Sequence, residues 1–166
     1  MLLIVVASAI VIPNYLRHME AARLDTSARR LLSCFLYARS QAIIRNAPYR
    51  LNVEQDGQRY WVTCYDADQA DQGQDPFRAD TSTLGLPEEL PEGVTFEQVL
   101  IGDESRQDAG STAAQTNDDG SLFIEFRPDG TCDGAHILIK GSRDERLALR
   151  ADALTGRAEI AQEAKQ

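Results

Sequence analysis

Histidine, cysteine and carboxylate side chains are the residues of this chain that could bind a metal ion or catalyse a reaction. The two histidines, His18 and His136, stand far apart and have no cysteine or carboxylate partner at the spacing of a metal site. The chain has no GxSxG, HExxH, P-loop or GxGxxG motif, so a membrane-tethered hydrolase using His136 is the weaker alternative. We therefore expect no catalytic, cofactor-binding or metal-binding residue and predict that the chain is not an enzyme.

Three cysteines are widely spaced and form no CxxC pair, which excludes a zinc ribbon or a thioredoxin motif. Cys34 falls on one face of a predicted helix, where we expect it to pack into the core as a small apolar residue. A disulfide between Cys64 and Cys132 is an open alternative if the domain lies in an oxidising compartment.

Three aspartates, Asp66, Asp68 and Asp71, begin a polar segment and raise the alternative of a calcium site. They lack the alternating ligands, the central glycine and the final glutamate of an EF-hand loop. We therefore expect a solvated loop over residues 66–93.

The charge of the chain limits its partners. It is 166 residues long with a formal net charge of −9 and a pI near 4.7. Nucleic acid and anionic lipid headgroups carry the same sign, so no nucleic-acid partner is favoured. A hydrophobic content of 43% is ordinary for one domain with a real core.

The first twelve residues, 1–12, form an almost purely apolar run that Pro13 closes. As a helix this run would be about 18 Å long, whereas a bilayer core about 30 Å thick needs around 20 apolar residues. A signal peptide is one alternative, but no basic residue precedes Leu2; a buried core helix is another, although every side of it would need covering. We favour a transmembrane helix, residues 1–13, whose first residues lie upstream of Met1.

The next segment, residues 14–47, continues this helix as an amphipathic rod. No glycine or proline occurs between Asn14 and Arg45, and apolar residues recur at a three-and-four spacing along one face. These residues are Leu24, Ala28, Leu31, Phe35, Ala38 and Ala42. We expect a kink at Pro13 and an end at residues 46–48.

The remainder, residues 48–166, has the pattern of an antiparallel β domain. Alternating or β-branched runs separated by turn residues predict seven strands. These lie at 49–53, 60–65, 94–101, 122–126, 135–139, 146–150 and 157–160. Residues 102–120 carry few large apolar side chains and are expected to form a second polar loop. The fold class is therefore α+β, a long N-terminal helix packed on an antiparallel sheet.

Four stretches together resemble the GspH/FimT family of type IV pilin-like proteins. They are the apolar run into residues 12–15, the helix-end stretch 38–46, the turn 126–131 and the closing residues 155–157. They follow the family's order and span most of the chain. The resemblance implies a pilin-like fold and a structural role, as a minor pseudopilin of a type II secretion system or a minor pilin of a type IV pilus.

The same resemblance implies a place and partners for the protein. It implies a single-pass protein of the bacterial inner membrane, with its C-terminal domain in the periplasm, which contacts inner-membrane lipid and other pilins or pseudopilins of one filament. The leader read by the prepilin peptidase is absent before Met1, so this peptidase is expected as a partner if the natural N-terminus is longer. Some relatives bind ligands or DNA through basic C-terminal residues, but residues 157–166 contain only one arginine.

Overall fold

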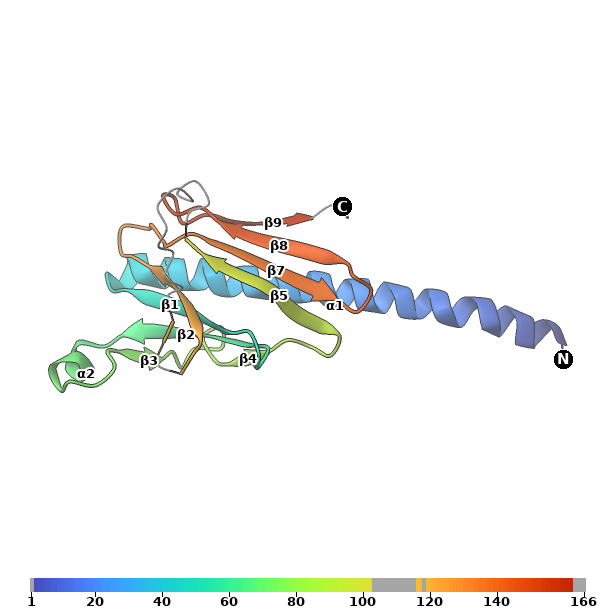
Figure 1. Ribbon diagram of the computed structural model, residues 1–166, viewed down its shortest axis with the longest axis horizontal. Coiled ribbons are helices and arrows are strands. Elements are labelled where there is room, and N and C mark those ends of the chain that lie inside the picture. The colour runs from blue at the N-terminus through green and yellow to red at the C-terminus, as the bar shows by residue number, and fades with distance from the viewer. Residues whose placement is uncertain (1, 103–115, 118, 163–166) are drawn as a thin grey trace.

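One long helix organises the molecule. The computed structural model describes residues 2–102, 116–117 and 119–162, and for residues 2–19 the backbone alone. α1 (Leu2–Arg45) has 44 residues, so it is about 66 Å long at 1.5 Å per residue. The helix passes Pro13 without a break in its secondary structure and curves gently toward its N-terminus (Figure 1). The predicted long N-terminal helix is thus confirmed.

The C-terminal half of α1 packs on the β domain through the face that the sequence pattern predicts. Residues at the three-and-four spacing, from Leu24 to Ala42, are at most 3% exposed. Phe35 lies at the centre of this face, and its ring meets that of Phe126 edge-on at 5.1 Å. The helix ends where Asn46 adopts a left-handed φ of 49°, and the N–H of Ala47 donates to the carbonyl of Ala42.

The first sheet, sheet A, has five strands. They are β1 (Tyr49–Glu54), β2 (Arg59–Tyr65), β3 (Phe77–Ala79), β4 (Glu88–Glu89) and β6 (Leu122–Phe126). The strand order is β3-β2-β1-β6, with β4 also paired to β2. In its central rows Leu51 pairs with Val62 and with Ile124, and all three are fully buried. The predicted hairpin of β1 and β2 is confirmed.

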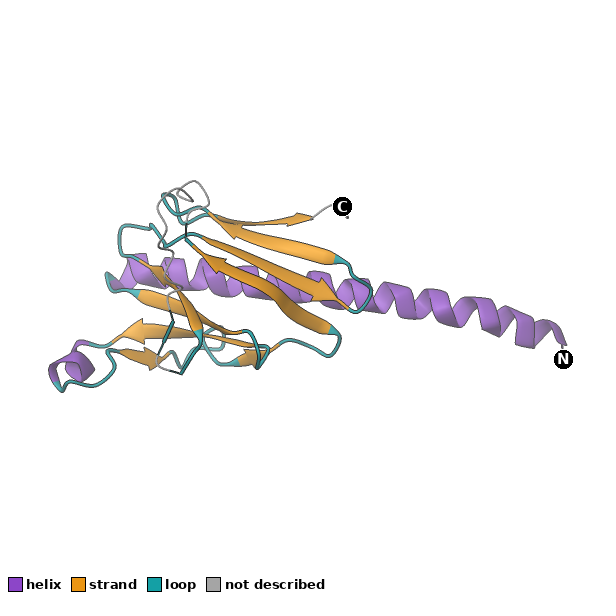
Figure 2. Cartoon of the chain, viewed as in Figure 1, coloured by secondary structure: helices purple, strands orange, loops and turns teal. Residues whose placement is uncertain are grey.

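The second sheet, sheet B, has four antiparallel strands in the order β5-β7-β8-β9. They are β5 (Val94–Ile101), β7 (Ala135–Gly141), β8 (Arg146–Ala151) and β9 (Ala158–Gln162). The strands form two groups against the same helix (Figure 2). The sequence predicted an antiparallel sheet and every strand of sheet B, but not the division in two. The division arises because β6 pairs with β1 rather than with β5, its predecessor in the chain.

The sequence predicted a loop over residues 66–93, but the structure forms regular elements within this segment. The segment contains α2 (Ala67–Asp71) and the short strands β3 and β4. These strands pair with the outer side of β2, which would otherwise expose its backbone hydrogen-bonding groups. Of the other predicted polar loop, 102–120, residues 103–115 and 118 lie outside the described residues.

Both sheets share one core with α1. Tyr60 of β2 and Phe96 of β5 meet edge-on at 6.4 Å and join the two sheets. Ile137 and Ile139 of β7 are at most 1% exposed on the side of sheet B that packs on the helix. The helix is therefore fixed to the domain along its C-terminal half.

Candidate interaction surface

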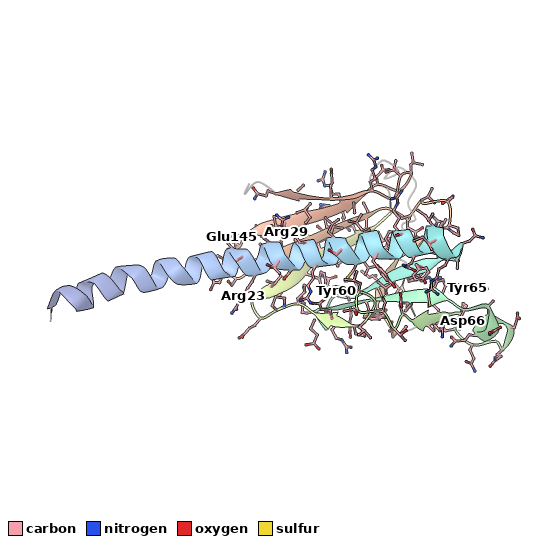
Figure 3. The ribbon with its side chains drawn as sticks, turned by 180° about the vertical axis from the view of Figure 1, so that it is seen from behind. Arg23, Arg29, Tyr60, Tyr65, Asp66 and Glu145 are labelled. Carbon is pink, nitrogen blue, oxygen red and sulfur yellow. The ribbon has the colours of Figure 1, made fainter. Side chains whose placement is uncertain are left out.

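The N-terminal half of α1 projects away from the β domain (Figures 1 and 3). Arg143, in the turn before β8, forms an ion pair with Glu20 at 3.0 Å, and Leu24 is the first residue of the buried face. Residues 2–19 continue the helix beyond these contacts, over about 27 Å at 1.5 Å per residue. Their sequence begins with the apolar run, residues 2–12.

The transmembrane segment predicted at residues 1–13 stays a prediction. Among the described residues, no helix is both long enough and apolar enough to cross a membrane.

The water-facing side of α1 beside the domain is charged. Arg29 donates to the carboxylate of Asp25 at 2.7 Å, and this hydrogen bond raises the pKa of the guanidinium. Arg30 reaches Glu88 of β4 at 2.9 Å. These pairs lie largely in solvent, where an ion pair adds little to stability. They keep this part of the helix in water, in contrast to the apolar run that begins the projecting half.

Of the two predictions about cysteines, the structure confirms one and contradicts the other. Cys34 is 3% exposed in the core, as expected, and burial raises the pKa of its thiol to about 11. The suggested bridge between Cys64 and Cys132 is wrong, because all three thiols are free. Cys64 pairs with Tyr49, Tyr49 with Phe126, and Phe126 with Cys132. Three strand spacings of about 4.8 Å separate the two cysteines, whereas a disulfide needs Cα atoms within about 7 Å.

His136 lies on β7 between Leu100 and Arg150 in the strand pairing. It is 9% exposed, and neither ring nitrogen has a hydrogen-bond partner in the structure. Among the described residues, therefore, no serine or carboxylate forms the hydrogen bond with it that a catalytic relay requires. His18 falls in the part of α1 for which the backbone alone is described.

Of the three aspartates of the calcium alternative, Asp66 has structural partners for its carboxylate. Asp66 caps α2 by accepting from the N–H of Asp68 and pairs with Arg78 at 3.1 Å. Asp71 ends α2 and is exposed. Within the described ranges no group of three or more histidine, cysteine or acidic residues could hold a metal ion. The absence of a metal or cofactor site stays a prediction.

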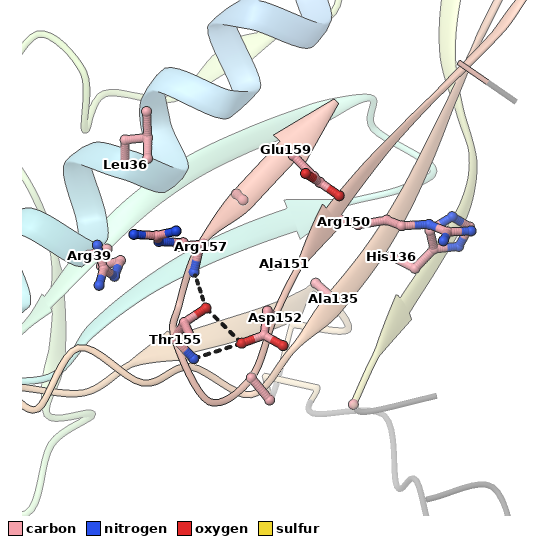
Figure 4. Close-up of a pocket in the computed structure, with 13 residues that line it drawn as sticks. Leu36, Arg39, Ala135, His136, Arg150, Ala151, Asp152, Thr155, Arg157 and Glu159 are labelled. Atoms are coloured by element: carbon pink, nitrogen blue, oxygen red, sulfur yellow. Dashed lines mark hydrogen bonds between the residues drawn. The ribbon is translucent and has the colours of Figure 1, made fainter. Parts of the chain in front are cut away.

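A contact between distant segments was not predicted. Arg39 of α1 donates from Nε to the carbonyl of Gly130 at 3.2 Å. Gly156, with φ of 59°, lies against the same group, and a Cβ there would be 2.2 Å from the Gly130 oxygen. The contact joins three of the four stretches that carry the family resemblance, so the sequence held a signal for it. Near it a cleft of about 740 Å³ opens between Leu36 and Arg157 (Figure 4).

Comparisons with known proteins agree with this architecture. The family model described as "Type II transport protein GspH" matches residues 27–155. Two structures of the minor pseudopilin EpsH from the type II secretion system of Vibrio cholerae are similar, with TM-scores of 0.61 and 0.62 at 14% and 17% identity. The matches cover 84% and 87% of this chain and 97% of each EpsH chain. No curated protein matches the chain.

Proposed function

This chain belongs to the GspH family, whose model matches more than half of its residues, and from that membership we propose that it is a minor pseudopilin. In this role it is a structural subunit of a type II secretion filament. The observation that carries the proposal is the division of α1: one half is held by the β domain and the other projects from it. A subunit that joins its neighbours through a helix bundle needs this division.

The place of the subunit follows from the apolar start of the projecting half. We propose that the protein is attached to the inner membrane through residues 1–13 in a single pass, with residues 14–47 leading to a periplasmic domain, residues 48–166. Lipid and a bundle of similar helices are both apolar, so transfer from membrane to filament keeps the segment out of water. Exposure of the segment to water would cost on the order of 10 kcal/mol at roughly 25 cal/mol per Å² of apolar area.

The partners of this role are other pseudopilins of the same filament and inner-membrane lipid. The prepilin peptidase joins them where the natural chain carries a leader. The role needs no catalysis, and family membership supports a structural protein rather than an enzyme. The alternative, a DNA- or ligand-binding minor pilin, lacks comparable support, because the two EpsH structures are of a secretion pseudopilin.

The proposal is tested by removing the gene from its host and measuring secretion. We expect exoproteins to remain in the periplasm of the deletion strain and to be released again when the wild-type gene is restored. The Val5→Asp variant should fail to restore release, because it places a charge in the apolar segment. Ile44→Asp is the matched control, because Ile44 lies on the same helix but is 72% exposed. Normal secretion without the gene, together with lost DNA uptake, would favour the alternative.

A further inference from the structure

β9 forms an open edge of sheet B, because no described strand pairs with its outer side (Figure 1). At the start of the β8–β9 hairpin, the N–H of Asp152 donates to the carbonyl of Arg157 at 2.9 Å. Hydrogen-bonded and non-hydrogen-bonded pairs alternate along an antiparallel ladder. The backbone groups of Glu159 therefore face β8, and those of Ala158 and Ile160 face outward. This outer side offers donors and acceptors at the spacing of another strand.

Two clefts lie at the ends of this edge, where it passes α1. The cleft of about 740 Å³ adjoins the start of β9, and its lining includes Leu36 and Ala158. A second cleft, of about 400 Å³, adjoins the end of β9 and includes Leu24 and Gln162. Leu36 is 49% exposed, so an apolar side chain laid along β9 would find a partner on the helix.

The larger cleft is lined by three arginines, Arg39, Arg150 and Arg157, and by two acidic residues, Asp152 and Glu159. Arg39 and Arg157 both line it, and their side chains point toward one another in Figure 4. Neither forms an ion pair with any described residue, although the chain as a whole has a net charge of −9.

The acidic residues of the same cleft have other neighbours. The Asp152 carboxylate accepts from the N–H and the hydroxyl of Thr155, both at 2.7 Å. Glu159 lies opposite Arg150 in the strand register. Two guanidinium groups that line one cleft and form no ion pair attract an anion, and carboxylates match their geometry.

We propose that an extended acidic segment of a partner protein adds to β9 as a fifth strand of sheet B. Its backbone pairs with Ala158 and Ile160, its carboxylates bind Arg39 and Arg157, and an apolar side chain packs against Leu36. A peptide fits better than a nucleic acid for two reasons. The outward carbonyl groups of β9 repel phosphate, and the acidity of the whole chain disfavours a long polyanion. This binding site does not depend on the proposed secretion role.

The test uses the full chain in neutral detergent and a fluorescent eight-residue peptide of alternating valine and glutamate. We expect the peptide to bind, with an affinity that falls as salt rises. The same peptide methylated on alternate backbone nitrogens keeps its charge but cannot pair as a strand, and it should bind at least tenfold more weakly. Arg157→Ala should weaken binding about tenfold, since a charge-assisted hydrogen bond is lost. Arg59→Ala is the control, because Arg59 is an exposed arginine on β2 that pairs with Glu54.

Other results would overturn the proposal. Equal binding of the methylated peptide would mean that charge alone attracts it, and equal binding of a valine–lysine peptide would remove the role of the arginines. Absence of peptide binding at millimolar concentration would show that β9 does not bind an acidic strand. If a 20-base-pair DNA duplex bound more tightly than the peptide, and Arg157→Ala abolished that binding, the arginines would form a DNA site instead. Dimerisation of the chain that blocks the peptide would assign the edge to a second copy.

Discussion

Phe35 is the side chain whose removal should cost the domain most. It is 1% exposed at the centre of the helix face, and its ring meets that of Phe126 edge-on at 5.1 Å. Truncation of a buried phenylalanine to alanine costs about 3–5 kcal/mol, which includes the cavity it leaves. Because this site also loses a ring–ring contact, we expect Phe35→Ala to lower the free energy of unfolding by about 4 kcal/mol. For a chain of this length that is a fall in Tm of roughly 12 °C.

The assay is thermal and urea unfolding of the full chain in detergent, followed by the fluorescence of Trp61, the single tryptophan. Leu36→Ala is the control, because Leu36 is the next residue of the helix but is half exposed. We expect this control to cost about 1 kcal/mol or less. If Phe35→Ala were no more destabilising than Leu36→Ala, the packing of α1 on the two sheets would be wrong.

Three further outcomes follow from named contacts. Gly156→Ala should lower the free energy of unfolding in urea by more than 2 kcal/mol, because the new Cβ would meet the Gly130 oxygen. Gly73→Ala is the control, because a Cβ at Gly73 meets nothing within 4 Å, and it should lose only about 1 kcal/mol for its positive φ. Equal losses in the two variants would refute the contact at Gly156. At pH 8, iodoacetamide should modify Cys64 before the other two thiols. Burial raises the pKa of Cys34 to about 11 and raises the pKa of Cys132 as well. Peptide mass spectrometry gives the order of modification, and an order in which Cys64 is not first would contradict this prediction. Hydrogen bonds from Arg146 hold the pKa of Glu97 below its ordinary 4.5, so the stability from this pair is present above pH 4.5 and is lost as pH falls through the lower folded value; NMR titration of Arg146→Gln should find the pKa of Glu97 raised, and an unchanged value would contradict the pairing.

Local pattern was enough to predict the helix and the main strands. The spacing of Leu24, Leu31 and Phe35 identified the face of α1 that packs on the sheets. Alternation and turn residues located the β1–β2 hairpin and the strands of sheet B. In each case the pattern reflects burial of one face of the element itself.

Features that depend on pairing between distant strands were not predictable in this way. Two sheets form because β6 crosses to β1, a choice that no local period records. Cys64 lies on β2 and Cys132 forms an isolated bridge to β6, with two residues between them across the sheet, so their distance could not be read from the sequence. The cleft of Arg39 and Arg157 lies between the end of α1 and a C-terminal turn. Both arginines belong to stretches that resemble the family, but the sequence pattern did not place them in one site.

The central claim is that the projecting half of α1 joins this subunit to its neighbours while the β domain stays outside. Photo-cross-linking in cells that secrete actively tests it most directly, with a photoreactive amino acid at Val5 and, for comparison, at Ile44. The account predicts cross-links from Val5 to the N-terminal helices of other pseudopilins and to lipid, and few or none from Ile44 to those helices. Cross-links from Val5 only to soluble periplasmic proteins would contradict it.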